Sequence, residues 1–219
     1  MNRQSPWTPL AFAAFRWLWI ACLVLYLAGH VYASSWGIGF IKETQRDRLH
    51  GRAGLLFANV LDASFVHSPR LFPDADQLRV LANIENRLGF IHPALFQTPE
   101  LSKLTNRPQL AGFFDSLTTE GTSGKAFGWA IIPKGFRPAD AVLLSYDDPA
   151  KGPVAFAIAV PALARRDVAQ ALADPRYEKS EWFCQFDCSK LVRGQVVTAW
   201  AFDAQKFILY PLASPQMLR

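Results

Sequence analysis

Apolar residues crowd the amino-terminal part of the chain in one run, residues 9–33, which is interrupted only by Arg16 and His30. About 20 mostly apolar residues let a helix cross the hydrocarbon layer of a bilayer, because a helix satisfies its own backbone hydrogen bonds there. The pattern therefore predicts a single transmembrane helix. We assign residues 1–36 to a membrane anchor of the signal-anchor kind.

A cleaved signal peptide is the alternative for the same segment. Arg3 would supply its positive region, and residues 31–33 would form a small-residue cleavage site. Signal cores run roughly 7–15 residues, which is shorter than this run, so we prefer the retained anchor and keep cleavage open. Aromatic rings, which favour the headgroup layer, flank and interrupt the run at Trp17, Trp19, Tyr26, Tyr32 and Trp36.

Two stretches with helical spacing follow the anchor. The first covers residues 44–61, and the second runs up to Gly89. Each has one apolar stripe that we expect to be buried. Three prolines then mark an irregular connector. We therefore predict a short helical neck and connector over residues 37–108. The two stripes are Leu49, Ala53, Leu56 and Val60, and then Leu78, Leu81, Ile84 and Leu88.

From residue 112 onward the apolar period changes from helical spacing to two. Several short strands with turns between them are typical of an antiparallel β-sandwich, immunoglobulin-like or jelly-roll-like. We assign residues 109–219 to such a domain, so the fold class is α+β. Strands are expected at 127–131, 140–146, 153–159, 181–186, 196–202 and 206–210, with one or two helical turns at 166–173.

The charge pattern gives conflicting signals about the side of the membrane. The net charge is +5, and more Lys and Arg follow the anchor than precede it, which favours a cytoplasmic domain. Long domains translocate with little regard for charge, however, and an amino-terminal span acts as an export signal. We expect a single-pass inner-membrane protein with a periplasmic, extracytoplasmic domain. No basic patch with interleaved aromatic residues indicates nucleic acid as a partner.

The two cysteines beyond the anchor, Cys184 and Cys188, have C-x3-C spacing without a second pair or a nearby histidine, which argues against zinc. On a straight strand they would lie about 13 Å apart, beyond the ~7 Å reach of a disulfide. A disulfide therefore requires the chain to turn after Phe186. A disulfide and two free thiols both stay open at this point.

No catalytic motif is present, whether a G-x-S-x-G elbow, a phosphate loop or a dinucleotide glycine pattern. We expect no catalytic residue, metal or cofactor. Four carboxylates could in principle gather around calcium. We prefer a hairpin turn for two of them, Asp147 and Asp148, because Asp side chains bond the backbone of turns. The other two are Asp140 and Asp203.

Tryptophan gives the best indication of a ligand site, with envelope glycan as the nearest abundant ligand. Trp129 and Trp200 lie in alternating strand patterns, for which a place in the core is the simpler interpretation. Trp182 stands beside charged Glu181, and we expect its side chain to be exposed. These three residues form the candidate ligand site.

Several motifs after the anchor resemble the carboxy-terminal region of bacterial polytopic membrane proteins without assigned activity, some with glycosyltransferase-like membrane portions. The resemblance implies a last membrane helix, a helical neck and an extracytoplasmic β domain, and it carries no catalytic residues. We therefore expect a non-catalytic accessory or interaction subunit that binds the bilayer and other membrane-protein subunits. A glycan-binding module and, less favoured, a glycan-modifying enzyme are the alternatives. The motifs lie at residues 51–57, 71–73, 127–133, 138–146, 166–168 and 200–203.

Overall fold

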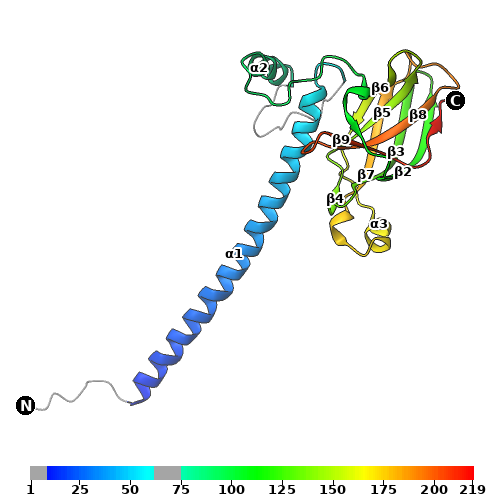
Figure 1. Ribbon diagram of the computed structural model, residues 1–219. Coiled ribbons are helices and arrows are strands. Elements are labelled where there is room, and N and C mark those ends of the chain that lie inside the picture. Colours follow the sequence, from blue (N-terminus) through cyan, green and yellow to red (C-terminus); the bar gives the residue numbers. More distant parts are fainter. Residues whose placement is uncertain (1–8, 62–74) are drawn as a thin grey trace, which may run out of the picture. The chain divides into compact units, whose positions relative to one another are not determined.

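The computed structural model describes residues 9–61 and 75–219. The chain forms two compact units, which divide between Arg46 and Asp47. The motif at residues 71–73 lies outside the described residues. Figure 1 shows the elements of each unit.

A single continuous helix, α1 (Pro9–Phe57), contains both the predicted anchor and the first neck helix. The expectation that the anchor helix and the first neck helix are separate was wrong. No proline interrupts the region between them, and its polar side chains bond back to the preceding turn. The Ser35 hydroxyl donates to the Tyr32 carbonyl at 2.7 Å, and the Thr44 hydroxyl donates to the Phe40 carbonyl at 2.9 Å. From Phe12 onward α1 is long and apolar enough to cross a membrane, by length and composition.

The second neck helix, α2 (Ala75–Arg87), forms where the spacing predicts it, but its apolar stripe is not buried. Leu81 and Ile84 are each 46% exposed and Leu88 is 64% exposed. The helix instead packs through the side that carries Ala82 and Asn83. The Asn83 and Asn59 amides exchange two hydrogen bonds of 3.0 Å, and this pair fixes which face of α2 turns inward.

Two mostly antiparallel sheets make up the rest of the second unit, as the change of period predicts (Figure 1). The pairing of β1 with β9 is parallel, and the other pairings are antiparallel. The first sheet contains, in order, β1 (Thr105–Asn106), β9 (Ile208–Pro211), β8 (Val196–Asp203), β5 (Ala141–Asp148) and β6 (Gly152–Ala159), with β10 (Gln216–Met217) also on β8. The second sheet contains β2 (Gly112–Glu120), β3 (Ser123–Ile132), β4 (Arg137–Pro138) and β7 (Glu181–Asp187).

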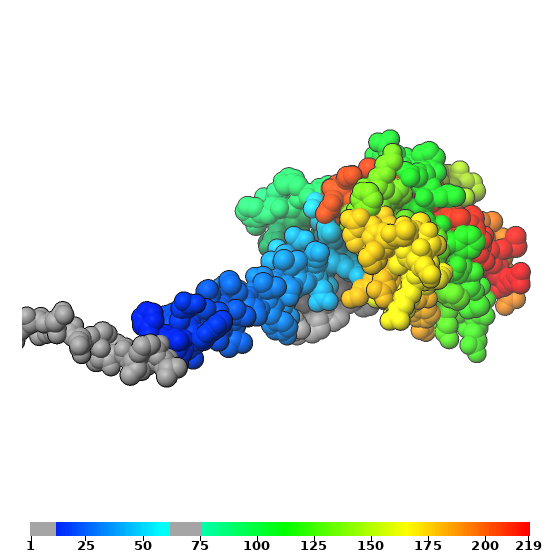
Figure 2. Space-filling view, turned by 90° about the horizontal axis from the view of Figure 1, so that it is seen from below, coloured from blue at the N-terminus to red at the C-terminus, as the bar shows by residue number. Residues whose placement is uncertain are grey.

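A short helix, α3 (Arg166–Ala171), lies between β6 and β7 and confirms the predicted helical turns at 166–173. Figure 2 shows the surrounding segment in yellow on the surface of the second unit. The Arg165 guanidinium holds this segment, because it donates to Asp115 of β2 at 2.7 Å and to Asp167 of α3 at 2.8 Å. Hydrogen bonds from Arg165 also lower the pKa of Asp167, so the pair is charged at neutral pH.

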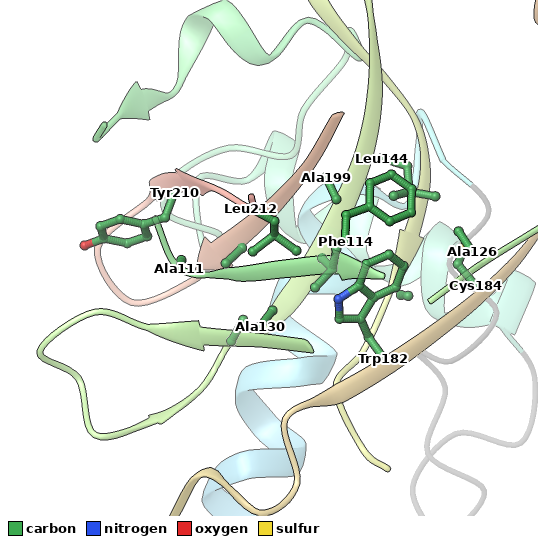
Figure 3. Close-up of a cluster of buried hydrophobic side chains, with 14 of the residues drawn as sticks. Ala111, Phe114, Ala126, Ala130, Leu144, Trp182, Cys184, Ala199, Tyr210 and Leu212 are labelled. Atoms are coloured by element: carbon green, nitrogen blue, oxygen red, sulfur yellow. The ribbon is translucent and has the colours of Figure 1, made fainter. Parts of the chain in front are cut away.

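The first core lies between the two sheets and is built around Trp182 (Figure 3). Its ring packs on Phe114 with ring centroids 5.5 Å apart, and the side chain is fully buried. The expectation that Trp182 is exposed was therefore wrong. That expectation was based on the charged neighbour in the sequence. Successive residues of a strand face opposite sides, so a charged neighbour does not prevent Trp182 from pointing inward.

Small residues of β3 make room for this ring. Ala126, Gly128 and Ala130 face the core, so Phe127 and Trp129 face outward. A Cβ atom on Gly128 would overlap the Phe113 carbonyl oxygen and come within 3.0 Å of Trp182. The expectation that Trp129 belongs to the core was thus wrong, because the space on that side is already filled.

The second core covers the outer face of the first sheet. The carboxy-terminal turns of α1 contribute Ala53, Leu56 and Phe57 to it, as the predicted first stripe requires. Trp200 lies half-buried at its margin, where its indole Nε1 donates to the Ser145 hydroxyl at 2.8 Å. The end of α1 is therefore part of the same packed unit as the β strands.

Candidate binding pocket between two sheet edges

The edges of the two sheets meet along β6 and β7. Backbone hydrogen bonds join the two edges at the start of β7. Leu163 N donates to the Glu181 carbonyl at 3.1 Å, and Glu181 N donates back to the Leu163 carbonyl at 3.2 Å. Nearby, the Cys184 thiol lies 3.7 Å from the Ile158 carbonyl oxygen. These contacts fix the two edges close together at that end.

Towards the other end the two strands enclose an open pocket of about 430 Å³, which we call the β6–β7 pocket. One wall comes from β6 and its hairpin partner β5, and the other comes from the second half of β7 and the turn that follows. The pocket is lined by Pro99, Tyr146, Val154, Ala155, Phe156, Ala157, Ile158, Gln185, Phe186, Asp187, Lys190 and Leu191.

Three aromatic rings cross this pocket from one sheet to the other. Tyr146 and Phe156 stack with centroids 6.3 Å apart, and Phe156 meets Phe186 at 5.1 Å. Phe156 lies at a β-bulge. Ser145 of β5 pairs with Ala155 of β6, and the next residue, Leu144, pairs with Ala157, so Phe156 is the extra residue without a partner in this ladder. A bulge of this kind re-aims the extra side chain, and here the extra residue is Phe156.

Polar groups stand among the lining residues. The Asp187 carboxylate accepts hydrogen bonds from the backbone N–H and the hydroxyl of Ser189, both at 2.9 Å. These bonds lower the pKa of Asp187, so it is ionised at neutral pH, with Lys190 also lining the pocket. The lining offers one carboxylate, whereas glycoside hydrolysis ordinarily uses two. The pocket thus combines aromatic rings with one ionised carboxylate and a lysine.

The structure does not bring the three predicted tryptophans together. Trp182 lies in the core between the sheets, Trp129 on the outer face of the second sheet, and Trp200 on the outer face of the first. None of them lines the β6–β7 pocket. The pocket aromatics were missed because a bulge is not visible in an alternating pattern; the only sign was one Phe within the small-residue strand 153–159.

No disulfide joins Cys184 and Cys188. The strand β7 stays extended through Asp187, so the chain does not make the turn after Phe186 that a disulfide requires. The Cys188 thiol instead lies 3.7 Å from the Gly121 carbonyl oxygen. Of the two alternatives left open by the sequence, the structure has the one without a disulfide.

The four acidic residues considered as calcium ligands do not gather at one site. Asp148 caps the β5–β6 turn by accepting from the N–H groups of Ala150 and Lys151 at 2.9 and 3.1 Å, as the turn interpretation predicts. Asp140 and Asp203 do meet, but the cation between them is the guanidinium of Arg137.

This buried ionic cluster of Arg137, Asp140 and Asp203 ties β4 to the ends of β5 and β8. Nη2 of Arg137 donates to Asp203 at 3.0 Å, and Ala204 N donates to Asp140 at 2.8 Å. Burial raises the pKa of Asp140, although its bonds to Arg137 and the Ala204 N–H oppose that rise. The cluster is internally satisfied and serves to hold strand ends together.

Comparison with known proteins gives no relative for this arrangement: no protein-family model, no curated protein and no solved structure matches the chain.

Proposed function

We propose that this protein is a membrane-anchored, non-catalytic accessory or interaction subunit that associates with a larger membrane complex. One observation carries the proposal. The most apolar stretch of α1 is not buried against any described part of the protein, and in this proposal lipid or the helices of other membrane proteins cover it. Large apolar side chains are exposed along this part of the helix, among them Leu23, Leu25 and Val31.

In this proposal the chain crosses the inner membrane once and holds its β domain on the extracytoplasmic side. The two sheets would be the faces of a β-sandwich, whose immunoglobulin-like or jelly-roll-like type stays a prediction. The lipid bilayer and neighbouring membrane-protein subunits are the partners. The exposed stripe of α2 supports an interaction role, because contiguous exposed apolar side chains mark contact surfaces.

An envelope glycan is the second candidate ligand. The observation that favours it is the row of aromatic rings in the β6–β7 pocket, which replaces the three tryptophans as the place for such a ligand. Glycan-modifying chemistry has less support, since the pocket supplies a single carboxylate.

Fractionation of cells that express the full chain tests the anchor. We expect the intact polypeptide, with its amino-terminal segment retained, in the membrane fraction after an alkaline wash. A variant with Leu23→Arg and Leu25→Arg should leave that fraction, because each arginine at mid-helix costs about 2.5–3.5 kcal/mol of insertion. A mature chain that begins after Ala33 contradicts the proposal.

Extraction in mild detergent then tests the association. We expect the chain to co-purify with a larger membrane complex, and protease added to spheroplasts should degrade the β domain. Migration only as a free monomer contradicts an accessory role. Protection from protease, with degradation after lysis, contradicts the extracytoplasmic side.

A further inference from the structure

We propose that the β6–β7 pocket receives an extended segment of a partner protein, which adds to the second sheet as a strand on the open edge of β7. This inference rests on the proposed interaction role and names the chemistry of the partner's contact. Three observations support it: the backbone groups along the edge of β7, the pocket beside this edge, and the exposed rings of Phe183 and Phe127 on the outer face of the second sheet.

The register of β7 shows which of its backbone groups face away from β3. Ala130 N donates to the Ser180 carbonyl at 2.9 Å, which makes this a hydrogen-bonded pair. In an antiparallel ladder such pairs recur at every second residue. Trp182, Cys184 and Phe186 therefore bond to β3, while the N–H and C=O groups of Phe183 and Gln185 point outward.

One backbone pairing already exists on this edge, at the start of β7. The segment at Leu163 exchanges both backbone bonds with Glu181, the residue two before Phe183. Within the described parts of the chain, no backbone hydrogen bond continues this pairing to Phe183 or Gln185. Because this pairing is antiparallel, its continuation towards Phe183 and Gln185 falls to the residues before Leu163, which instead follow from β6 of the first sheet. An added strand would take the position beside β7 that those residues do not pair with.

The side chains of an added strand would have places on both faces. Those that point inward would enter the pocket beside Phe156 and Phe186. Those that point outward would lie beside Phe183, which is 48% exposed and pairs across the sheet with Phe127, itself 41% exposed. Cross-strand contact with such rings stabilises a strand, so the segment should carry apolar residues at alternate positions.

The backbone edge favours an extended peptide over the other possible occupants. A glycan could stack on the aromatic rings, but it has no alternating N–H and C=O groups spaced to match Phe183 and Gln185. A second copy of this chain could offer its own β7, but Cys184 and Phe186 of that strand pack within its own fold and could not enter the pocket. An extended segment from a different protein supplies both the alternating backbone groups and side chains that are able to enter the pocket.

The test uses a phage-displayed library of random dodecapeptides, selected on the full-length chain in lipid nanodiscs. We expect enrichment of peptides with alternating apolar residues. The affinity of a synthetic enriched peptide is then measured for Gln185→Pro and Gln185→Ala. Both remove the same side chain, but only proline removes the outward N–H, and edge positions tolerate proline. The proline variant should bind about tenfold more weakly than the alanine variant, as expected for a lost hydrogen bond of ~1.4 kcal/mol.

Backbone methylation of the peptide gives a second measurement that leaves the protein unchanged. Methylation of the amides in one alternating set should abolish binding, and methylation of the other set should be tolerated, because only one set faces β7. Equal effects of both sets, equal binding to the two Gln185 variants, or no enrichment over empty nanodiscs overturns the proposal. So does tight binding of envelope oligosaccharides that competes with the peptide.

These experiments distinguish failure of the strand-addition proposal from failure of the proposed accessory role. If the chain co-purifies with a membrane complex and Gln185→Pro does so as well as Gln185→Ala, the strand-addition proposal fails while the accessory role stands. If the chain is a free monomer but the peptide results hold as expected, the accessory role fails and the strand-binding edge stands.

Discussion

Phe57, the last residue of α1, stands edge-on against Phe202 of β8, with ring centroids 5.5 Å apart and planes at 81°. Both side chains are fully buried, and Phe96 of the connector stacks on Phe57 with ring centroids 4.6 Å apart. The helix that carries the membrane-spanning candidate therefore ends inside the hydrophobic core of the β unit, and a single ring joins helix, connector and sheet.

Phe57→Ala should destabilise the β unit strongly. Truncation of a buried Phe to Ala costs about 3–5 kcal/mol, because contacts are lost and a cavity stays behind. Thermal unfolding of the full chain in detergent, followed by near-ultraviolet circular dichroism, measures the effect. The matched control is Phe40→Ala, since Phe40 lies on the same helix but is exposed. A Phe57→Ala variant that unfolds at the same temperature as the Phe40→Ala variant would contradict this role.

Two glycines should respond in opposite ways to alanine. At Gly128 the added Cβ would overlap the Phe113 carbonyl oxygen, so Gly128→Ala should prevent normal pairing of β2 with β3 and lower the stability markedly. At Gly51, inside α1, nothing lies within 4 Å of the new Cβ, and alanine should raise helix stability by roughly 1 kcal/mol. Denaturant midpoints of the two variants check both directions, and a Gly128→Ala protein as stable as the parent would refute the packing.

The sequence was sufficient to predict elements whose pattern depends on local physics. The apolar length of α1, the Asp148 turn and the strand at 196–202 all follow from spacing and turn chemistry, and each forms as expected. Such features are readable because the residues that decide them lie within one helix turn, hairpin or strand.

Which face of an element is buried was harder to predict. For β3, alternation alone leaves two choices, and the large residues at 127 and 129 suggested the wrong one. The choice is made by Trp182, more than fifty residues later, which fills the core and leaves room only for Gly128 on that side. The pocket likewise depends on where two sheet edges part, which no local pattern encodes.

Ser180 offers a test of hydrogen-bond satisfaction in the core. Its hydroxyl is buried without a hydrogen-bond partner within the described structure. Ser180→Ala should therefore leave stability unchanged or raise it, because a buried unpaired hydroxyl costs free energy. Ser145→Ala is the contrast: its hydroxyl pairs with the Trp200 indole N–H, and its loss should cost about 1–3 kcal/mol. If chemical denaturation gives Ser180→Ala the larger loss, the Ser180 hydroxyl has a partner in solution.

The buried ionic cluster makes a signed prediction about pH. Burial raises the pKa of Asp140 above its ordinary, unfolded-state value, even though Arg137 faces it. Between that value and the higher folded-state pKa, the folded protein keeps the proton while the unfolded chain releases it. Folding then binds protons, so the Asp140 contribution to stability is greatest below the unfolded-state pKa and falls as pH rises through the folded one.

Asp140→Asn isolates this contribution, since its side chain does not titrate. The free energy of unfolding of the parent minus that of Asp140→Asn should decrease as pH rises from below the unfolded-state pKa, about 3.9, through the higher folded-state one. Titrations that Asp140 does not influence cancel in this difference. Urea unfolding at several pH values measures it. A difference that increases with pH would mean that Arg137 outweighs burial and that the carboxylate, once ionised, stabilises the fold.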